Sequence, residues 1–182
     1  KQCRQFACAH CVSHFYDVGK MGIEHALLPE QGVVTAGDCI IGADSHTCTY
    51  GCLGAFGTGV GCTDYLYAMV TGKSWVMVPE TLRFNLTGAL RKGVTARDVI
   101  LTIIGKIGAN GANYKAMEFA GPGLAGLSVS DRFVLCNLAV EAGAKTGLMP
   151  VDEVTLEYLK AHGREPVACY ESDPDAEFAE VY

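Results

Sequence analysis

Three polar residues that can move protons or bind carboxylates stand side by side in the stretch GADSHTCTYG. Asp44, Ser45 and His46 directly follow the apolar run CIIGA at 39–43, which predicts a buried strand. In α/β proteins, ligands bind beyond the carboxyl ends of parallel strands. A carboxylate, a hydroxyl and an imidazole together could orient a proton, bind a carboxylate or donate to an oxyanion. The spacing alone fits equally well a plain Asx or Ser turn that carries a surface histidine.

Two further titratable residues are candidates with weaker local support. His25 lies in GIEHALLPE and, taken alone, fits a histidine with satisfied hydrogen bonds better than a ligand or catalyst. Glu118 lies in the apolar run KAMEFAG before a Gly-Pro-Gly turn. A glutamate in such a run either faces solvent at a sheet edge or is buried with a partner. Both interpretations of Glu118 stay open at this point.

The cysteines and glycines do not form a recognisable cofactor motif. Cys8 and Cys11 enclose a histidine in CAHC, but no second pair follows at zinc-site spacing, and helical flanks are unusual for a redox CxxC. The glycine-rich run at 51–64 lacks the context of a dinucleotide site, and no Walker lysine is present. Nine scattered cysteines predict reduced thiols, mostly small buried hydrophobes, in a cytoplasmic protein.

Composition excludes several classes of protein. The 182 residues are 49% hydrophobic and 19% charged, with a formal net charge of −6. Such a composition argues against disorder, and no basic stripe is available for nucleic acid or an anionic membrane. No apolar run approaches the length of a membrane span, and no signal-like segment is present. We therefore expect neither a nucleic-acid partner nor a membrane.

The elements that must position these residues alternate between strands and helices, which predicts an α/β fold. Thr95, with Asp98 three residues later, is a candidate helix N-cap, and Ser130 is a candidate N-cap for the next helix. The sequence pattern changes at Pro79, which predicts two units, near 1–79 and 80–150. A short amphipathic helix and a polar, acidic tail follow over 151–182.

The order of the motifs resembles the aconitase superfamily. The match runs through LLPEQGVVTAGDCIIGADSHTCTYGCLGAFGTGVGCTD, GVTARDVILTIIGKIGANGANYKAMEFAGPG and LSVSDRFVLCNLAVEAGAKTGLMPVDE, nearly the whole chain. It is nearest to the two-subunit dehydratases of the superfamily. The resemblance implies aconitase-like α/β/α units, with 1–79 as the second half of a first domain and 80–150 as a second domain. Residues 151–182 would lead toward a missing third domain.

The resemblance also implies an activity. Superfamily members dehydrate and rehydrate hydroxy-di- or tricarboxylic acids on a 4Fe-4S cluster whose open iron is a Lewis acid. We expect a 2-isopropylmalate-type hydroxy-dicarboxylic acid as substrate, leucine biosynthesis as pathway and a separate small subunit as partner. Homoaconitase and a methyl-substituted malate dehydratase are alternatives within the class. A non-catalytic zinc- or thiol-binding α/β module and a thiol redox protein are alternatives outside it.

Two histidine–carboxylate pairs follow from the resemblance. His25 would pair with Asp44, and His46 with Glu118. In each pair the carboxylate fixes the orientation of the imidazole and raises its basicity, so that it can handle the proton of the departing hydroxyl. Ser45 would contribute a hydroxyl to the substrate region.

The cysteines that hold the cluster in the superfamily are a lone cysteine followed by a CxxC in a later portion. We expect these metal ligands beyond Tyr182, because CAHC at 8–11 precedes the Asp-Ser-His stretch and is not the cluster motif. Residues 1–182 are therefore expected to be an internal fragment. By itself the fragment should bind no cluster and turn over no substrate.

Overall fold

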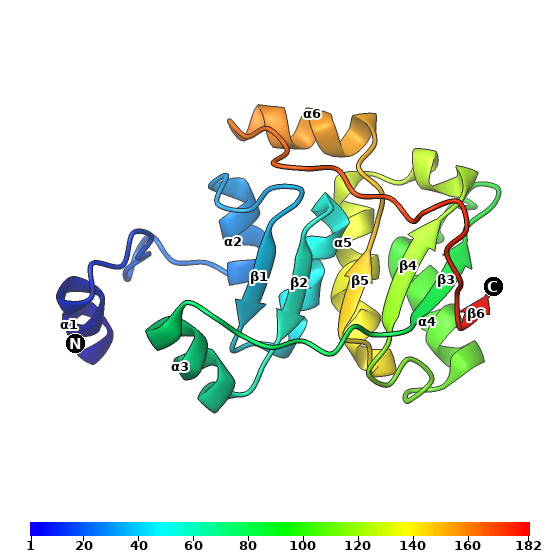
Figure 1. The fold of residues 1–182 in the computed structure, drawn as a ribbon. Helices are drawn as coiled ribbons and strands as arrows, with labels where there is room; N and C mark the ends of the chain where they lie inside the picture. The colour runs from blue at the N-terminus through cyan, green and yellow to red at the C-terminus, as the bar shows by residue number, and fades with distance from the viewer.

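The computed structural model describes every residue from Lys1 to Tyr182, and its strands form two sheets (Figure 1). The smaller sheet pairs β1 (Cys39–Gly42) with β2 (Phe56–Gly59). The larger sheet has the order β5 (Thr146–Leu148), β4 (Ala116–Ala120), β3 (Thr81–Asn85) and β6 (Glu180–Val181). All strand pairs are parallel, which confirms the α/β fold class.

Helices make the connections between these strands. The α-helices are α1 (Gln2–Ala9), α2 (Glu24–Glu30), α3 (Cys62–Thr71), α4 (Ala96–Ile107), α5 (Val129–Asn137) and α6 (Glu153–Ala161). Three 3-10 helices are η1 (Ser45–Leu53), η2 (Pro122–Gly126) and η3 (Leu138–Ala142). Helices α4 and α5 pack together behind the larger sheet in the view of Figure 1. No helix has both the length and the apolar character that crossing a membrane requires.

The N-termini of the helices show how local chemistry sets the elements. The Asp98 carboxylate accepts hydrogen bonds from the backbone N–H and the hydroxyl of Thr95, at 2.8 and 2.7 Å, which confirms the predicted capping box. The N-cap of α5 is Ser128, so the prediction of Ser130 is wrong. The physical reason is that Ser128 has an acidic residue three positions later, Asp131, whose carboxylate accepts from the Ser128 N–H.

One hydrophobic core of 22 buried residues draws on both the 1–79 and the 80–182 parts of the chain. Gly51 of η1 lies directly against β5, where a Cβ would come within 1.6 Å of the Gly147 carbonyl oxygen. The Gly51 carbonyl oxygen also accepts a hydrogen bond from the Met149 N–H at 3.1 Å. The element that follows β1 is therefore fastened to the larger sheet, while the domain boundary near Pro79 stays a prediction.

Two predictions about burial are wrong. All nine cysteines are free thiols, as expected, but only Cys48, Cys52 and Cys136 are buried. Several of the others lie on or just after α1, which buries only Ala7. Strand β1 is not fully buried either: Cys39 is exposed and its other residues are half-buried, because β2 is its sole strand neighbour.

The segment after α6 crosses the front of both sheets before ending beside β3 (Figure 1, orange to red). The backbone N–H groups of Val167 and Ala168 donate to the Ala36 carbonyl oxygen at 2.9 and 3.3 Å. The predicted tail over 151–182 thus contains the expected helix, and its last residues form the edge strand β6.

Candidate active site

The turn after β1 aims the Asp-Ser-His side chains. Asp44 is the N-cap of η1, and its Oδ1 accepts a hydrogen bond from the His46 backbone N–H at 2.7 Å. The Asp44 carbonyl oxygen accepts from the Thr47 hydroxyl, also at 2.7 Å. The local backbone is therefore an Asx-type turn. This turn fixes the direction of His46 relative to the Asp44 carboxylate.

Asp44 also contacts His25, so the structure brings this expected pair together. The His25 Nε2 lies 3.0 Å from Asp44 Oδ1, and the His25 residue on α2 is about nine-tenths buried. The hydrogen bond from the His46 backbone N–H and then the bond from His25 lower the pKa of Asp44. Asp44 is thus an anion at neutral pH, which requires the His25 Nε2 to carry the proton it donates. The His25 Nδ1 is buried without a hydrogen-bond partner.

His46 lies between two carboxylates. Its Nδ1 is 3.2 Å from the Ser45 hydroxyl and 3.5 Å from Asp44 Oδ1, and its Nε2 is 3.5 Å from Glu141 Oε1. The His46 side chain is 34% exposed, which leaves room for a ligand to touch the ring. The ring centroids of His25 and His46 are 6.3 Å apart. The imidazoles and carboxylates thus form one continuous polar cluster.

The structure does not bring His46 and Glu118, the second expected pair, into contact. Glu118 lies in the middle of β4, in register with Arg83 of β3, and its Oε1 is 3.0 Å from the Arg83 guanidinium. Its other carboxylate oxygen accepts a hydrogen bond from Ser172 at 2.7 Å. His46, by contrast, follows the end of β1 in the other sheet. The oppositely charged central residues of TLRFN and AMEFA were the available signal for the Arg83–Glu118 pair.

Glu141 was missed in the sequence although a signal was present. Asn137 and Glu141 are four residues apart in the otherwise apolar run NLAVEA, a spacing that places side chains on one helical face. The Asn137 amide donates to the Thr49 hydroxyl of η1 at 2.8 Å, and Glu141 reaches His46 at the start of the same element. This polar face is therefore turned toward η1.

The thiols of the chain do not fit a 4Fe-4S cluster, which needs a set of cysteine thiolates. Burial raises the pKa of Cys48 to about 11 and holds the pKa values of Cys52 and Cys136 well above the ordinary thiol value. The only three His, Cys or acidic residues whose ligand atoms converge are Glu24, His25 and Asp44, and this group contains no thiol. CAHC likewise contributes to no converging group.

The parallel sheets and the histidine–carboxylate cluster define a class of protein that the sequence comparisons identify. The sequence model of the Aconitase family (aconitate hydratase) matches residues 2–181 of this chain. The chain therefore belongs to this family. The predicted resemblance is therefore confirmed.

Particular relatives are similar over the full chain. The 2,3-dimethylmalate dehydratase large subunit of Eubacterium barkeri is 56% identical over 182 residues, which are 100% of this chain and 43% of the relative. The 3-isopropylmalate dehydratase large subunit of Helicobacter hepaticus is 57% identical over 181 residues, with the same shares. That of Lachnoclostridium phytofermentans is 54% identical over 178 residues, 98% of this chain and 42% of the relative. The chain spans less than half the length of these relatives.

Proposed function

We propose that this chain is part of the large subunit of a hydro-lyase that isomerises 2-isopropylmalate to 3-isopropylmalate by dehydration and rehydration, in leucine biosynthesis. Membership of the aconitase family and the names of the relatives support this class of reaction. The observation that carries the proposal is the placement of His46, partly exposed between the carboxylates of Asp44 and Glu141.

The reaction requires a general acid that protonates the departing hydroxyl. Dehydration removes a proton from one carbon and hydroxide from its neighbour. We assign to His46 the role of the acid that donates the proton converting this hydroxide to water. When water adds to the other carbon, the same imidazole accepts a proton from it. Asp44 and Glu141 flank the ring and restrict its orientation. Ser45, exposed beside the ring, would hydrogen-bond a substrate carboxylate.

His25 has a positioning role in this scheme. Its Nε2 donates to the same Asp44 oxygen that receives the His46 backbone N–H. A buried imidazole in this position restricts the rotation of the Asp44 carboxylate. His25 thereby keeps the carboxylate oriented on the turn that carries His46.

The rest of the machinery would come from outside residues 1–182. A 4Fe-4S cluster held there would supply a Lewis acid for the substrate hydroxyl and a carboxylate. A small subunit would complete the substrate pocket and provide the base that removes the carbon-bound proton. The free thiols of this chain suit a reducing, cytoplasmic setting.

The test uses the full-length large subunit, co-purified with its small subunit and reconstituted with iron and sulfide under anaerobic conditions. The unsaturated intermediate is followed by ultraviolet absorbance with 2-isopropylmalate, 2,3-dimethylmalate and homocitrate as substrates. The proposal predicts the highest kcat/KM with 2-isopropylmalate. Turnover of none of these hydroxy acids by the reconstituted enzyme would contradict the proposed reaction class.

A second candidate substrate has specific support, because the relative from Eubacterium barkeri is named a 2,3-dimethylmalate dehydratase. Both substrates are hydroxy-dicarboxylic acids and make the same demands on His46. A higher kcat/KM with 2,3-dimethylmalate would retain the site chemistry and replace only the substrate.

A further inference from the structure

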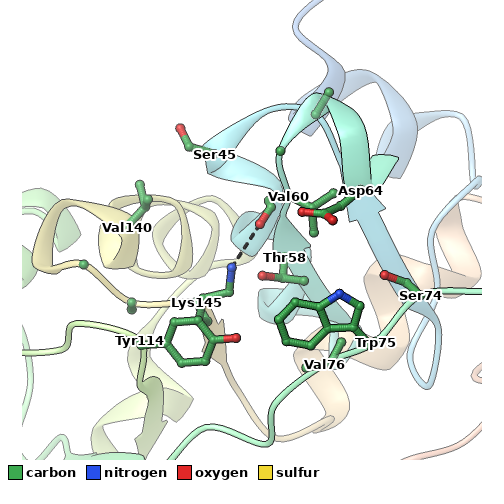
Figure 2. A pocket seen from close by; sticks show the side chains of 15 residues that line it. Ser45, Thr58, Val60, Asp64, Ser74, Trp75, Val76, Tyr114, Val140 and Lys145 are labelled. Carbon is green, nitrogen blue, oxygen red and sulfur yellow. Dashed lines mark hydrogen bonds between the residues drawn. The ribbon is translucent and has the colours of Figure 1, made fainter. Parts of the chain in front are cut away.

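Lys145 lies in the loop between η3 and β5, in a cavity of about 500 Å³ beside the candidate site (Figure 2). Ser45 is on the rim of this cavity, and Trp75 and Tyr114 form part of its wall. The proposed chemistry does not use Lys145. Its contacts nevertheless connect the two segments that meet at His46.

The ammonium of Lys145 has two defined contacts. Its Nζ donates a hydrogen bond to the Gly59 carbonyl oxygen at 3.1 Å, drawn as the dashed line in Figure 2. The same Nζ lies 5.3 Å from the centroid of the Tyr114 ring. A charge-assisted bond to a carbonyl is stronger than a neutral one, and the ring face adds a cation–π attraction.

Gly59, at the end of β2, transmits this contact to the Asp-Ser-His turn. A Cβ at Gly59 would come within 2.6 Å of the Asp44 carbonyl oxygen and 2.9 Å of the Ser45 Cα. The two backbones are therefore in direct contact with no side chain between them. A displacement of the Gly59 backbone would move the turn that aims His46.

On its other side, Lys145 belongs to the segment that carries Glu141. The helix η3 is followed by its C-cap Gly143, whose carbonyl oxygen accepts a hydrogen bond from the Tyr114 N–H at 3.0 Å. The Lys145 N–H donates to the Lys115 carbonyl oxygen at 2.9 Å. These bonds fix the backbone of Gly143 and Lys145, so a movement of Lys145 is expected to move Glu141 with it.

We propose that Lys145 is a positioning residue that sets the separation between the turn carrying His46 and the segment carrying Glu141. This inference rests on the proposed role of His46 as the proton carrier. The titratable groups that face His46 are Asp44, Glu141 and, one ring further away, His25. Without the bond to Gly59, the Asn137–Thr49 hydrogen bond and side-chain packing would remain to hold the segment of Glu141 against η1, and neither acts on the Gly59 side of the Asp-Ser-His turn. A shift of about 1 Å in a catalytic constellation costs on the order of 100-fold in rate.

The experiment compares Lys145→Met, Lys145→Arg and the control Lys106→Met in the full-length large subunit with its small subunit. Lys106 is a matched control because its Nζ likewise lies near an aromatic ring, 5.1 Å from the centroid of Tyr182, and it has no role in the proposed chemistry. We expect Lys145→Met to lower kcat by roughly 10- to 100-fold with KM nearly unchanged. Lys145→Arg restores most of kcat, since the guanidinium can donate to the same carbonyl, and Lys106→Met matches the wild type.

Crystal structures of the same three variants provide a readout that needs no substrate. In Lys145→Met the separation of His46 Nε2 and Glu141 Oε1 should increase from 3.5 Å, while Lys145→Arg and Lys106→Met retain it. An unchanged separation in Lys145→Met overturns the inference, whether or not kcat falls. An inactive wild-type enzyme would instead contradict the proposed function, and the three structures would still decide the role of Lys145.

Discussion

Two groups of carboxylates and basic side chains, one around Arg132 and one around His46, differ in burial and in the length of their polar contacts. Arg132 is fully buried, and its guanidinium makes two bonds of 2.6 Å to the Asp152 carboxylate. It also donates to the Thr155 hydroxyl and the Leu124 carbonyl oxygen, at 3.1 and 3.0 Å. The contacts between imidazole and carboxylate side chains in the His46 cluster are longer, at 3.0 to 3.5 Å.

This difference indicates that the Arg132–Asp152 pair is a structural anchor between α5 and α6, whereas the His46 cluster is suited to proton transfer. Burial alone would raise the pKa of Asp152, but its bonds from Arg132 and the Thr155 N–H outweigh burial and lower it. That carboxylate therefore keeps one charge state and ties α5 to α6. The imidazole of His46 keeps exposed surface and two flanking carboxylates, the arrangement that proton transfer requires.

The largest effect is expected at the proton carrier. The substitution His46→Asn keeps a polar side chain of similar width but cannot transfer a proton, so kcat of the full-length enzyme should fall by about 10²- to 10⁴-fold. The free energy of unfolding should change little, because the ring is partly exposed. Steady-state kinetics and denaturant unfolding measure the two effects. Retention of wild-type kcat would show that His46 does not handle the proton.

Substitution in the Arg132–Asp152 pair should lower the free energy of unfolding and leave kcat unchanged. Asp152→Ala leaves the Arg132 guanidinium buried without its counter-charge, and loss of one partner of a buried pair costs about 3–5 kcal/mol of folding free energy. The substitution also removes the N-cap bond to the Thr155 N–H. Denaturant unfolding of the full-length subunit measures the loss, and kcat per folded molecule should remain that of the wild type. An Asp152→Ala enzyme with the wild-type free energy of unfolding but a lowered kcat would contradict the structural role of this pair.

A smaller effect is expected in acid. Because the pKa of Asp152 is lower in the folded protein than in the unfolded chain, its contribution to stability is present above the unfolded value, about 3.9. The contribution is lost as the pH falls through the lower folded value. Asp152→Asn keeps a side-chain oxygen at the N-cap but removes this titration. Its free energy of unfolding should therefore fall less steeply than that of the wild type as the pH drops below about 4. Parallel curves would mean that the pair does not contribute to acid stability.

The parts of the fold that were predicted correctly depend on local chemistry. The Thr95–Asp98 capping box can be found within four residues of sequence, and the run that became β1 is bounded by polar turn residues. The burial of β1 could not be found in this way. It depends on how many strands join the smaller sheet, which no local pattern specifies.

The site shows the same limit. The contact between His25 and Asp44 was expected from the family resemblance, because the residues alone favoured a satisfied histidine at position 25. The choice between Glu118 and Glu141 required tertiary structure, because each glutamate lies in an apolar run of a regular element. Only the cross-strand register shows that Arg83 neutralises Glu118, and only the packing of η3 on η1 shows that Glu141 reaches His46.

The most direct test of the account compares Glu141→Gln with Glu118→Gln in the reconstituted two-subunit enzyme, with 2-isopropylmalate as substrate. Each substitution removes one charge and keeps the shape of the side chain. The account predicts that Glu141→Gln lowers kcat by about 10- to 100-fold, while Glu118→Gln leaves kcat unchanged. A large loss of kcat in Glu118→Gln, together with wild-type kcat in Glu141→Gln, would contradict the assignment of Glu141 as the carboxylate of His46.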